Sequence, residues 1–579
     1  MKGMPLKNRL QKGILSILLP AFAMTGGPVQ ANPRGGVVIH GAADIANLSA
    51  SQLRIHQTTR NVVINWQDFS INQGELTRFV QPKNGTALNR VVSGNISEIH
   101  GQLKGNSNVY VINPNGIVIG ANGVIDVGGN AVLSTLDIDD DDFLDGGTSR
   151  FYGNSTTGVT NFGTISSSGG DVVLMGGFVD NQGQIGALNG TVAIGSGGEI
   201  LLQEGAGSKI TVRGSSDYTG TGVNNSGTIR GASAELKAHG NVYALAINNS
   251  GAIRATGADR SNGRVRLTAS GSSSNINLGS NSMIVARSGG DGGSVEVDAG
   301  NGRVNLAGVV DAGGAENGGE VSVVGNEIVQ AAGSAVVASG GTLGGKVKVD
   351  AADTMSLSGA VRSEGTFGAG GQVDLTARSI LINDSAVVSA NGDALGGTLR
   401  IGGDYQGRDT GLREAETVRV EDGAKLSADA SSGDAGTVIV WSNGDTIFLG
   451  DVSARAKGAV GNGGLVEVSG KQNLYFDGTV GVNAANGKSG TVLFDPGDVV
   501  IGSAGGLTPP LGSPVLDSLI NISAINDTLQ SGANVLVVTD SGSIEIQDLG
   551  GGGTNISDAS GSNRHAAIQW TNSLSSFGA

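Results

Sequence analysis

The sequence predicts an all-β fold, a right-handed parallel β-helix (a solenoid) with a cap at its N-terminal end. Two observations predict it. The first is a Gly-Gly pair that recurs every 26 residues (319−293, 345−319, 371−345, 397−371), at Gly292-Gly293, Gly318-Gly319, Gly344-Gly345, Gly370-Gly371 and Gly396-Gly397. The second is the segment after each pair, such as SVEVDA or KVKVDA, in which apolar and polar residues alternate with the period of a β-strand. Two further apolar patches complete each unit, so three strands and three turns fill one repeat.

A strand triplet of this size cannot bury its apolar side alone, so the units must stack at roughly 4.8 Å per rung. A sandwich or propeller is the alternative, but a propeller blade takes four strands and about 40 or more residues. The chain has 101 Gly in 579 residues and only 4% aromatic residues, which we interpret as many tight turns. Its 38% hydrophobic residues recur with period 2 and can build a core, so we expect a folded chain.

Residues 1–31 have the pattern of a secretory signal peptide, which the Sec machinery would read. An apolar run, Ile14–Met24, lies between four basic residues and the small-residue ending Val29-Gln30-Ala31, after which we expect cleavage. A membrane anchor is the alternative, but the run has about half the length needed to span a bilayer. No later stretch is long and apolar enough either, so we expect no integral membrane segment in the mature chain.

Charge and cysteine content exclude several classes of function. The leader holds four basic residues and no acidic one, so its removal changes the net charge from −15 to −19 (−15 − 4). Such a charge opposes nucleic-acid binding. Without any Cys, an exported chain has neither a disulfide framework nor a thiolate metal site.

From Gly35 to Leu136 the expected strands are longer, more aromatic and less repetitive. We interpret this stretch as the cap, because the first rung of a solenoid exposes unpaired backbone and an open core. Within it, Asn113-Pro114-Asn115-Gly116 predicts a tight turn. Pro fixes φ at the second position, and Asn115 and Gly116 tolerate left-handed values.

Four segments in this region resemble the two-partner secretion exoproteins of Gram-negative bacteria, which include filamentous haemagglutinin and the high-molecular-weight adhesins. They are VINWQDFSINQGE (63–75), FVQP (79–82), ALNRVVSGNISEIHGQL (87–103) and VINPNGIVIG (111–120). The family's Asn-Pro-Asn-Leu motif is absent. Ala87–Val91 stands in its region, as in the branch that resembles the high-molecular-weight adhesins.

The resemblance implies that residues 32–145 form a secretion domain, recognised by a partner barrel transporter in the outer membrane during transit through the periplasm. It also implies which residues matter for export. They are Asn89, Arg90, Asn113, Pro114, Asn115, Gly116 and Ile117. The alternative for these residues is that they only fold the cap.

An acidic run, Asp137 with Asp139–Asp142 and Asp145, raises the possibility of a calcium site. Its spacing lacks the alternating ligands of a calcium loop, so we expect a solvated loop that projects from the helix. Residues 146–270 resemble the haemagglutination-type repeats of the same family, with an Asn before each Gly turn. We expect these Asn side chains to stack as a ladder of amides.

Residues 271–495 hold the 26-residue repeats, interrupted by a charged insertion near 407–423. We expect a loop or extra strand there, either for ligand contacts or as plain length variation. Gly and Pro increase from Pro496 to Pro514, which indicates a joint between two solenoid blocks. Residues 496–579 would hold this joint and the start of further repeats, and we expect the chain to be a fragment of a longer exoprotein.

An enzyme is the serious competitor, because polysaccharide-cleaving β-helices exist and cluster carboxylates with a basic residue on one face. Here the repeat carboxylates are scattered at outward positions, namely Glu296, Asp298, Glu320, Asp350 and Asp374. No metal-binding, phosphate-binding or nucleophile motif occurs. We therefore predict no enzyme activity, no catalytic or metal site and no cofactor.

The function predicted from the sequence is a secreted adhesin that binds host glycans or proteins through many weak contacts along a rod. Capture of haem or a haem carrier is one alternative, and the stalk of a contact-dependent toxin is another. We expect an extracellular protein and leave its retention at the cell surface open.

Overall fold

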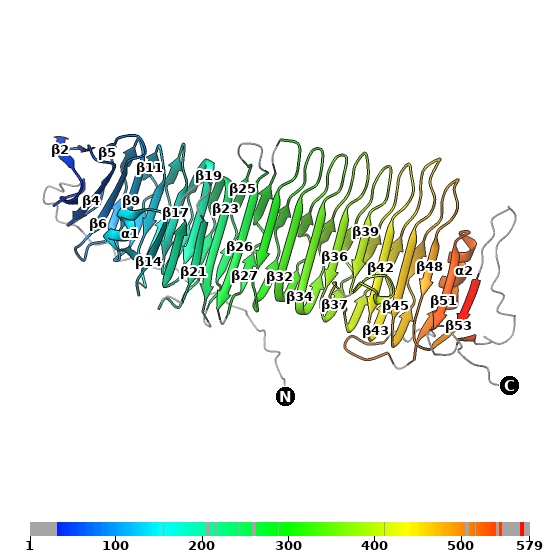
Figure 1. Ribbon diagram of the computed structural model, residues 1–579. Helices are drawn as coiled ribbons and strands as arrows, with labels where there is room; N and C mark the ends of the chain where they lie inside the picture. Colours follow the sequence, from blue (N-terminus) through cyan, green and yellow to red (C-terminus); the bar gives the residue numbers. More distant parts are fainter. Residues whose placement is uncertain are drawn as a thin grey trace, which may run out of the picture.

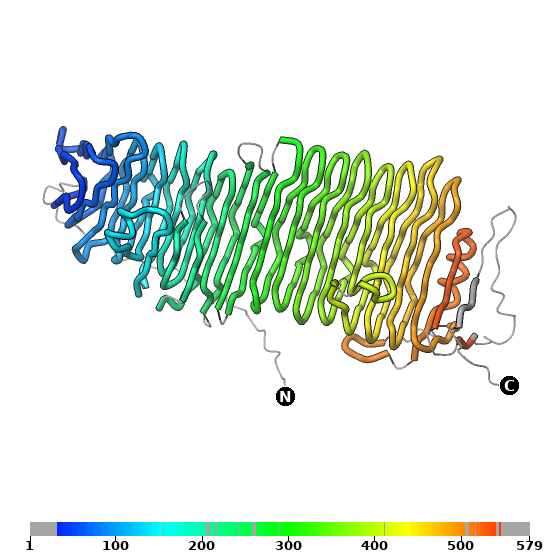
Figure 2. The backbone as a smooth tube through the Cα atoms, in the orientation of Figure 1, coloured from blue at the N-terminus to red at the C-terminus, as the bar shows by residue number. Residues whose placement is uncertain are grey.

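The computed structural model is a long, slightly curved rod of stacked rungs, with the N-terminal strands at one end and the C-terminal strands at the other (Figures 1 and 2). It describes residues 32–539, apart from 155, 204–208, 215–216, 242–243, 258–261, 272, 288, 410, 504–508 and 516, and the strands 544–546 and 568–572. The predicted signal peptide, residues 1–31, lies outside the described residues.

The rungs build three faces, and within each face the strands of successive rungs pair in parallel. Face 1 consists of β3 (Gln52–Gln57), β5 (Leu76–Val80), β8 (Gln102–Gly105), β11 (Val124–Val127), β16 (Thr164–Ser167), the first parts of β19 (Gln184–Ser196) and β23 (Thr228–Gly240), β25 (Ala252–Ala255), β28 (Met283–Ala286), β31 (Val309–Asp311), β33 (Ala335–Val337), β35 (Ala360–Arg362), β38 (Val387–Ser389), β41 (Lys425–Ser427), β44 (Asp451–Ser453) and β47 (Thr479–Gly481). Face 2 consists of β4 (Asn61–Trp66), β6 (Thr86–Val91), β9 (Asn108–Ile112), β12 (Ala131–Ser134), β17 (Val172–Gly176), the second parts of β19 and β23, β26 (Arg264–Gly271), β29 (Ser294–Asp298), the first parts of β32 (Glu320–Gln330) and β34 (Lys346–Leu357), β36 (Gln372–Thr376), β39 (Thr398–Ile401), β42 (Thr437–Ser442), β45 (Leu465–Gly470), β48 (Thr491–Phe494), β51 (Asn534–Thr539) and β53 (Ile568–Asn572). Face 3 consists of β7 (Ser97–Ile99), β10 (Ile117–Ile119), β15 (Gly158–Asn161), β18 (Phe178–Asn181), β22 (Val223–Asn225), β24 (Ile247–Asn249), β27 (Ile276–Leu278), β30 (Arg303–Leu306), the second parts of β32 and β34, β37 (Ser379–Ile382), β40 (Thr417–Val420), β43 (Asp445–Phe448), β46 (Asn473–Phe476), β50 (Leu519–Asn521), β49 (Val499–Gly502) and β52 (Ile544–Ile546).

The 26-residue interval is the register of the stack, which confirms the predicted parallel β-helix. Val347 on β34 pairs in parallel with Val321 on one side and Val373 on the other. All three are fully buried in one continuous core, whereas the neighbouring Lys346 points outward and is exposed. The alternation in the sequence therefore fixed which side chains fill the interior.

The Gly-Gly pairs allow a close approach of neighbouring rungs, whereas we had interpreted the glycines as residues of tight turns. A Cβ at Gly345 would overlap the carbonyl oxygen of Gly319 in the preceding rung. The same close approach recurs at the equivalent glycines Gly371 and Gly397. Glycine is required here because the backbones of successive turns lie in direct contact, and not because φ is positive.

The cap is much shorter than the predicted stretch from Gly35 to Leu136. Among the described strands at this end, only β1 (Val37–His40), antiparallel to β4, and β2 (Ala43–Ser49), antiparallel to β3, depart from the parallel stack. Parallel pairing already begins between β3 and β5 and between β4 and β6. The longer, more aromatic strands therefore belong to regular rungs.

These rungs are more apolar because an additional sheet covers the outside of face 2. It is antiparallel, in the order β13 (Asp137–Ile138), β14 (Thr148–Tyr152), β20 (Glu199–Gln203) and β21 (Lys209–Arg213), and the short helix α1 (Asp140–Asp145) joins its first two strands. Phe143, Phe151 and Ile200 from these elements pack on an outward column of face 2. That column is Val63, Leu88, Tyr110, Val132, Val173 and Ala193. Strands buried on both sides are apolar at nearly every position.

The predicted asparagine ladder is present inside face 3. Each Nδ2 donates to the Oδ1 of the next rung, over 2.8 Å from Asn161 to Asn181 and 2.7 Å from Asn181 to Asn225 and from Asn225 to Asn249. All four side chains are fully buried. The last amide donates to the hydroxyl of Ser282, so the ladder ends on a side chain that can accept the bond.

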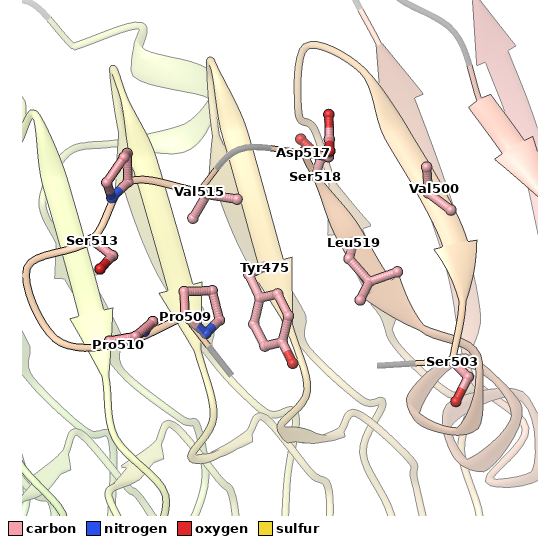
Figure 3. Close-up of a pocket in the computed structure, with 11 residues that line it drawn as sticks. Tyr475, Val500, Ser503, Pro509, Pro510, Ser513, Val515, Asp517, Ser518 and Leu519 are labelled. Atoms are coloured by element: carbon pink, nitrogen blue, oxygen red, sulfur yellow. The ribbon is translucent and has the colours of Figure 1, made fainter. Parts of the chain in front are cut away.

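The segment from Pro496 to Pro514 does not divide the solenoid into two blocks. Face 2 continues directly from β48 to β51, and β50 is inserted between β46 and β49 on face 3. Residues 509–515, here called the strap, lie back along face 3, where Val515 packs with Ile447 and Tyr475 (Figure 3). A hollow of about 780 Å³ remains between the strap and this face.

The helix α2 (Ile522–Gln530) follows β50, and its capping residue Asn521 accepts a hydrogen bond from the amide of Ser523. Ile522, Ile525 and Leu529 are buried in the main core. Helix α2 contacts β47, β50 and β51, at the level where β47 is the last strand of face 1. No helix among the described residues is long and apolar enough to cross a bilayer.

Candidate secretion-partner surface

The Asn113–Gly116 turn is held by its own side chains. The amide of Gly116 donates to the carbonyl of Asn113 over 3.1 Å, which closes the turn. Asn113 Oδ1 accepts from the backbone amide of Asn115, and its Nδ2 donates to Ser97 Oγ and to Asn95 O in the preceding rung. Of the two residues that tolerate left-handed values, Gly116 has one (φ 125°) and Asn115 does not.

The turn offers little side-chain surface to a partner. Asn113, Gly116 and Ile117 are buried, Asn115 is half-buried, and Pro114 is exposed. Thr157 of a later rung donates to the carbonyl of Pro114 over 2.8 Å. These contacts give the turn a clear role in folding, and only Pro114 presents its side chain fully to the outside.

Asn89 lies inside the first rungs. Its Oδ1 accepts the indole hydrogen bond of Trp66 over 3.0 Å, and its Nδ2 donates to the carbonyl of Tyr110 over 3.0 Å. Trp66 packs edge-on against Phe69, with 5.6 Å between ring centroids. Asn89 therefore satisfies the one polar side-chain atom of a fully buried tryptophan. The sequence motifs did not predict this hydrogen bond.

Arg90 anchors the acidic run, which is not the projecting loop that we expected. Its guanidinium, 14% exposed, donates to Asp137 over 2.9 Å, to Asp140 over 2.6 Å and to the carbonyl of Ile138 over 2.5 Å. Asp140 begins helix α1, so three charge-assisted bonds from a face 2 strand hold the start of this helix against the rod. The acidic segment lies on the outside of face 2 because it is bonded to Arg90 and packs on the apolar column.

We predict that Arg90→Ala lowers the free energy of unfolding by about 1–3 kcal/mol, because three hydrogen bonds to a partly buried cation are lost together. Urea unfolding followed by circular dichroism measures this change. The matched control is Arg150→Ala, since Arg150 is 53% exposed and pairs with Glu199 on the additional sheet. If Arg90→Ala kept full stability but was no longer secreted, the transporter would contact Arg90 directly.

A second candidate site lies under the charged insertion, which runs over residues 402–416. Residues 417–420, which the prediction included in the insertion, instead form the regular face 3 strand β40. The single turn η1 (Tyr405–Gly407) lies over Trp441, which is 5% exposed. Arg413 pairs with Asp350 over 3.0 Å at the far end of the insertion. The insertion is therefore packed onto face 2 and does not project.

Two buried carboxylates face this insertion. The amide of Gln406, whose φ is 53°, donates to both oxygens of Glu467 over 3.1 and 3.2 Å, and its side chain donates to Asp495 over 3.1 Å. Burial raises the pKa of Glu467 to about 8, and the nearby charges of Asp495 and Asp404 act in the same direction, while hydrogen bonds from Gln406 and Ser469 oppose them. Neither carboxylate was among the residues singled out in the sequence.

The repeat carboxylates are not all outward and solvated. Glu320 is exposed and Glu296, Asp298 and Asp350 are half-buried, but Asp374 is only 2% exposed. Both of its oxygens accept from Arg400 on the next strand, over 2.8 and 3.1 Å. Asp374 has the predicted outward phase, between the inward Val373 and Leu375, but it is not solvated, and the paired arginine compensates its burial.

Comparison with known proteins places these features in a family. A family model described as the TPS (two-partner secretion) secretion domain matches residues 29–283. The chain carries a two-partner secretion domain. The match runs past the predicted domain end at residue 145 and takes in the additional sheet and the asparagine ladder.

A curated relative of this chain is the Heme/hemopexin-binding protein of Haemophilus influenzae, 35% identical over 248 residues. The match covers 41% of this chain and 27% of the relative, so the chain spans well under half of that protein's length. Among solved structures, the HMW1 secretion domain from Haemophilus influenzae is similar at 22% identity, with 79% of this chain and 100% of that chain covered and a TM-score of 0.37. The filamentous hemagglutinin secretion domain is similar at 13% identity, with 61% and 99% covered and a TM-score of 0.29.

The secretion domain implies a partner transporter in the outer membrane and secretion through it. The N-terminal rungs with the additional sheet, helix α1 and the Asn113–Gly116 turn lie within the matched secretion domain. Of the seven predicted export residues, the structure brings Asn89 and Arg90 together on β6 and places the other five on the turn before and at the start of β10.

Proposed function

We propose that this exoprotein is an adhesin, which binds host cells or matrix outside the bacterium through the exterior of the rod and catalyses no reaction. The observation that supports this proposal is the filled interior. Inward side chains of the repeats, such as Val321, Val347 and Leu375, are 0% exposed, so a ligand can meet only outward side chains and turns. A regular exterior repeats its contacts from rung to rung, and several weak contacts on one rod add up through avidity.

The curated relative's name favours a second candidate, the capture of haem or of a haem carrier such as hemopexin. The identity of 35% reaches over 41% of this chain, which supports a related role without requiring it. Both candidates share the same physical basis, a non-enzymatic binding surface on a rigid rod. They differ in the ligand.

Three measurements on the full secreted chain test these candidates. An adhesin is expected to bind epithelial cells saturably, whereas a haem-carrier ligand would give surface plasmon resonance with immobilised hemopexin. Direct haem capture would give a Soret band on titration with haemin. A chain that bound none of the three would contradict both candidates.

A further inference from the structure

Three large apolar side chains lie in consecutive turns on one corner of the rod. Leu343 is 49% exposed, Phe367 78% and Leu395 47%, in three consecutive rungs between face 1 and face 2. Leu343 and Leu395 are both in parallel register with Ala369 of the middle rung. We call Leu343, Phe367, Ala369 and Leu395 the apolar ridge.

The ridge is not a consequence of the repeat. At the same register position, the rung before it carries Asn317 and the rung after it carries Asp434, so polar residues serve the fold equally well there. The large side chains of the apolar ridge point away from the core, so the chain itself does not bury them. An exposed apolar patch with polar limits is typical of an interaction surface.

The backbone holds this corner rigidly. The amide of Phe367 donates to Gly341 O over 2.7 Å, that of Ala369 to Thr342 O over 3.0 Å and that of Ala394 to Gly368 O over 3.0 Å. Each turn is thus hydrogen-bonded to the turn of the preceding rung. Phe367 therefore lies on an ordered backbone. Binding of a partner over this aromatic side chain costs little conformational entropy.

Carboxylates outnumber basic side chains around the ridge. The five turns of this corner, residues 313–319, 339–345, 363–371, 390–397 and 428–436, carry Glu316, Glu364, Asp393, Asp429 and Asp434. Lys346 and Arg362 lie at the strand ends next to these turns, and Lys457 pairs with Asp429 over 2.8 Å. Glu316 and Asp393 form no ion pair with any described residue. A second copy of the chain is a poor partner, because packing ridge on ridge would bring these carboxylates together.

We propose that the apolar ridge docks into an apolar groove of a host protein and that Lys and Arg side chains rim this groove. The convex ridge fits a concave partner, Phe367 is the central anchor, and the surrounding carboxylates match the basic rim. This inference rests on the proposed binding function and deepens it, because it names the surface and the chemistry of the partner.

The test compares the wild-type chain with the triple variant Leu343→Ser, Phe367→Ser, Leu395→Ser, using immobilised hemopexin and epithelial cells as probes. We expect at least tenfold weaker binding to the probe that the wild type binds, with an unchanged circular dichroism spectrum because all three side chains are exposed. Val460→Ser is the matched control, since Val460 is 66% exposed on the same corner but outside the ridge. Its binding should not change.

A second pair, Glu316→Lys and Asp393→Lys, tests the charge rim. Slower association and a weaker dependence on salt are expected for this variant. Equal binding of the triple variant and the wild type would overturn the ridge while leaving the binding function in place. Equal losses for Val460→Ser and the triple variant would also overturn it. If the wild type bound neither probe, the ridge proposal would fall together with the binding function.

Discussion

Val347→Asp is expected to prevent folding of the rod from that rung onward and to reduce secretion to a small fraction of the wild-type yield. Val347 is 0% exposed and lies between Val321 and Val373 in the core. A carboxylate there has no partner, so its burial costs several kcal/mol, roughly the whole contribution of one rung. Each rung of a solenoid contacts only its neighbours, so a rung that cannot stack leaves the following rungs unsupported.

The link to secretion follows from the repeat architecture. Each rung that folds outside the membrane buries further apolar area, at roughly 25 cal/mol per Å², and so opposes the chain's return through the transporter. We infer that a rung that cannot stack stalls this process, although Val347 touches no transporter.

Lys346→Asp is the matched control. Lys346 is adjacent in sequence but exposed, so the same new charge lies in water and should be tolerated. The measurement is the amount of each variant in the medium, followed by circular dichroism of the purified protein. Equal secretion of the two variants would rule out the coupling between core stacking and export.

Glu467→Gln is expected to stabilise the protein at alkaline pH, by an amount that reaches its full size at about pH 8 and stays constant above it. Burial raises the pKa of Glu467 from its ordinary 4.5 to about 8. Below pH 4.5 the group is protonated in both the folded and the unfolded chain and has no effect. Between 4.5 and 8 the unfolded chain releases the proton while the folded chain retains it, so stability falls by about 1.4 kcal/mol per pH unit.

Glutamine keeps an oxygen that can accept a hydrogen bond from the Gln406 amide, and its side chain does not ionise. The variant and the wild type should therefore be similarly stable at pH 4, and the variant should be more stable at pH 8 by an amount on the order of a few kcal/mol. Urea unfolding at several pH values measures the difference. Glu320→Gln is the control, because Glu320 is exposed. A variant that was less stable than the wild type at pH 8 would show that the ionised carboxylate is the form that the insertion needs.

Parts of the candidate site could be read from the sequence because they repeat or occur in a fixed local pattern. The turn at Asn113–Gly116 and the segment with Asn89 and Arg90 were identified by their motifs. The structure places Asn89 and Arg90 on the face 2 strand β6, and the turn directly after β9, the face 2 strand of the next rung. Their partners were not identified. Trp66 reaches Asn89, and Asp137 and Asp140 reach Arg90, over separations of 23, 47 and 50 residues.

The sequence by itself determined the solenoid, its 26-residue register, the inward phase of Val347 and the asparagine ladder. It could do so because neighbours in the stack are one repeat apart, so a local period specifies the tertiary contact. Only the tertiary structure decided the additional sheet on face 2, the short cap, the docking of the insertion over Glu467 and the strap on face 3. These elements pack through pairings such as Phe151 with Ile200, which no period encodes, because side chains distant in sequence meet only after the stacked faces exist to bring them together.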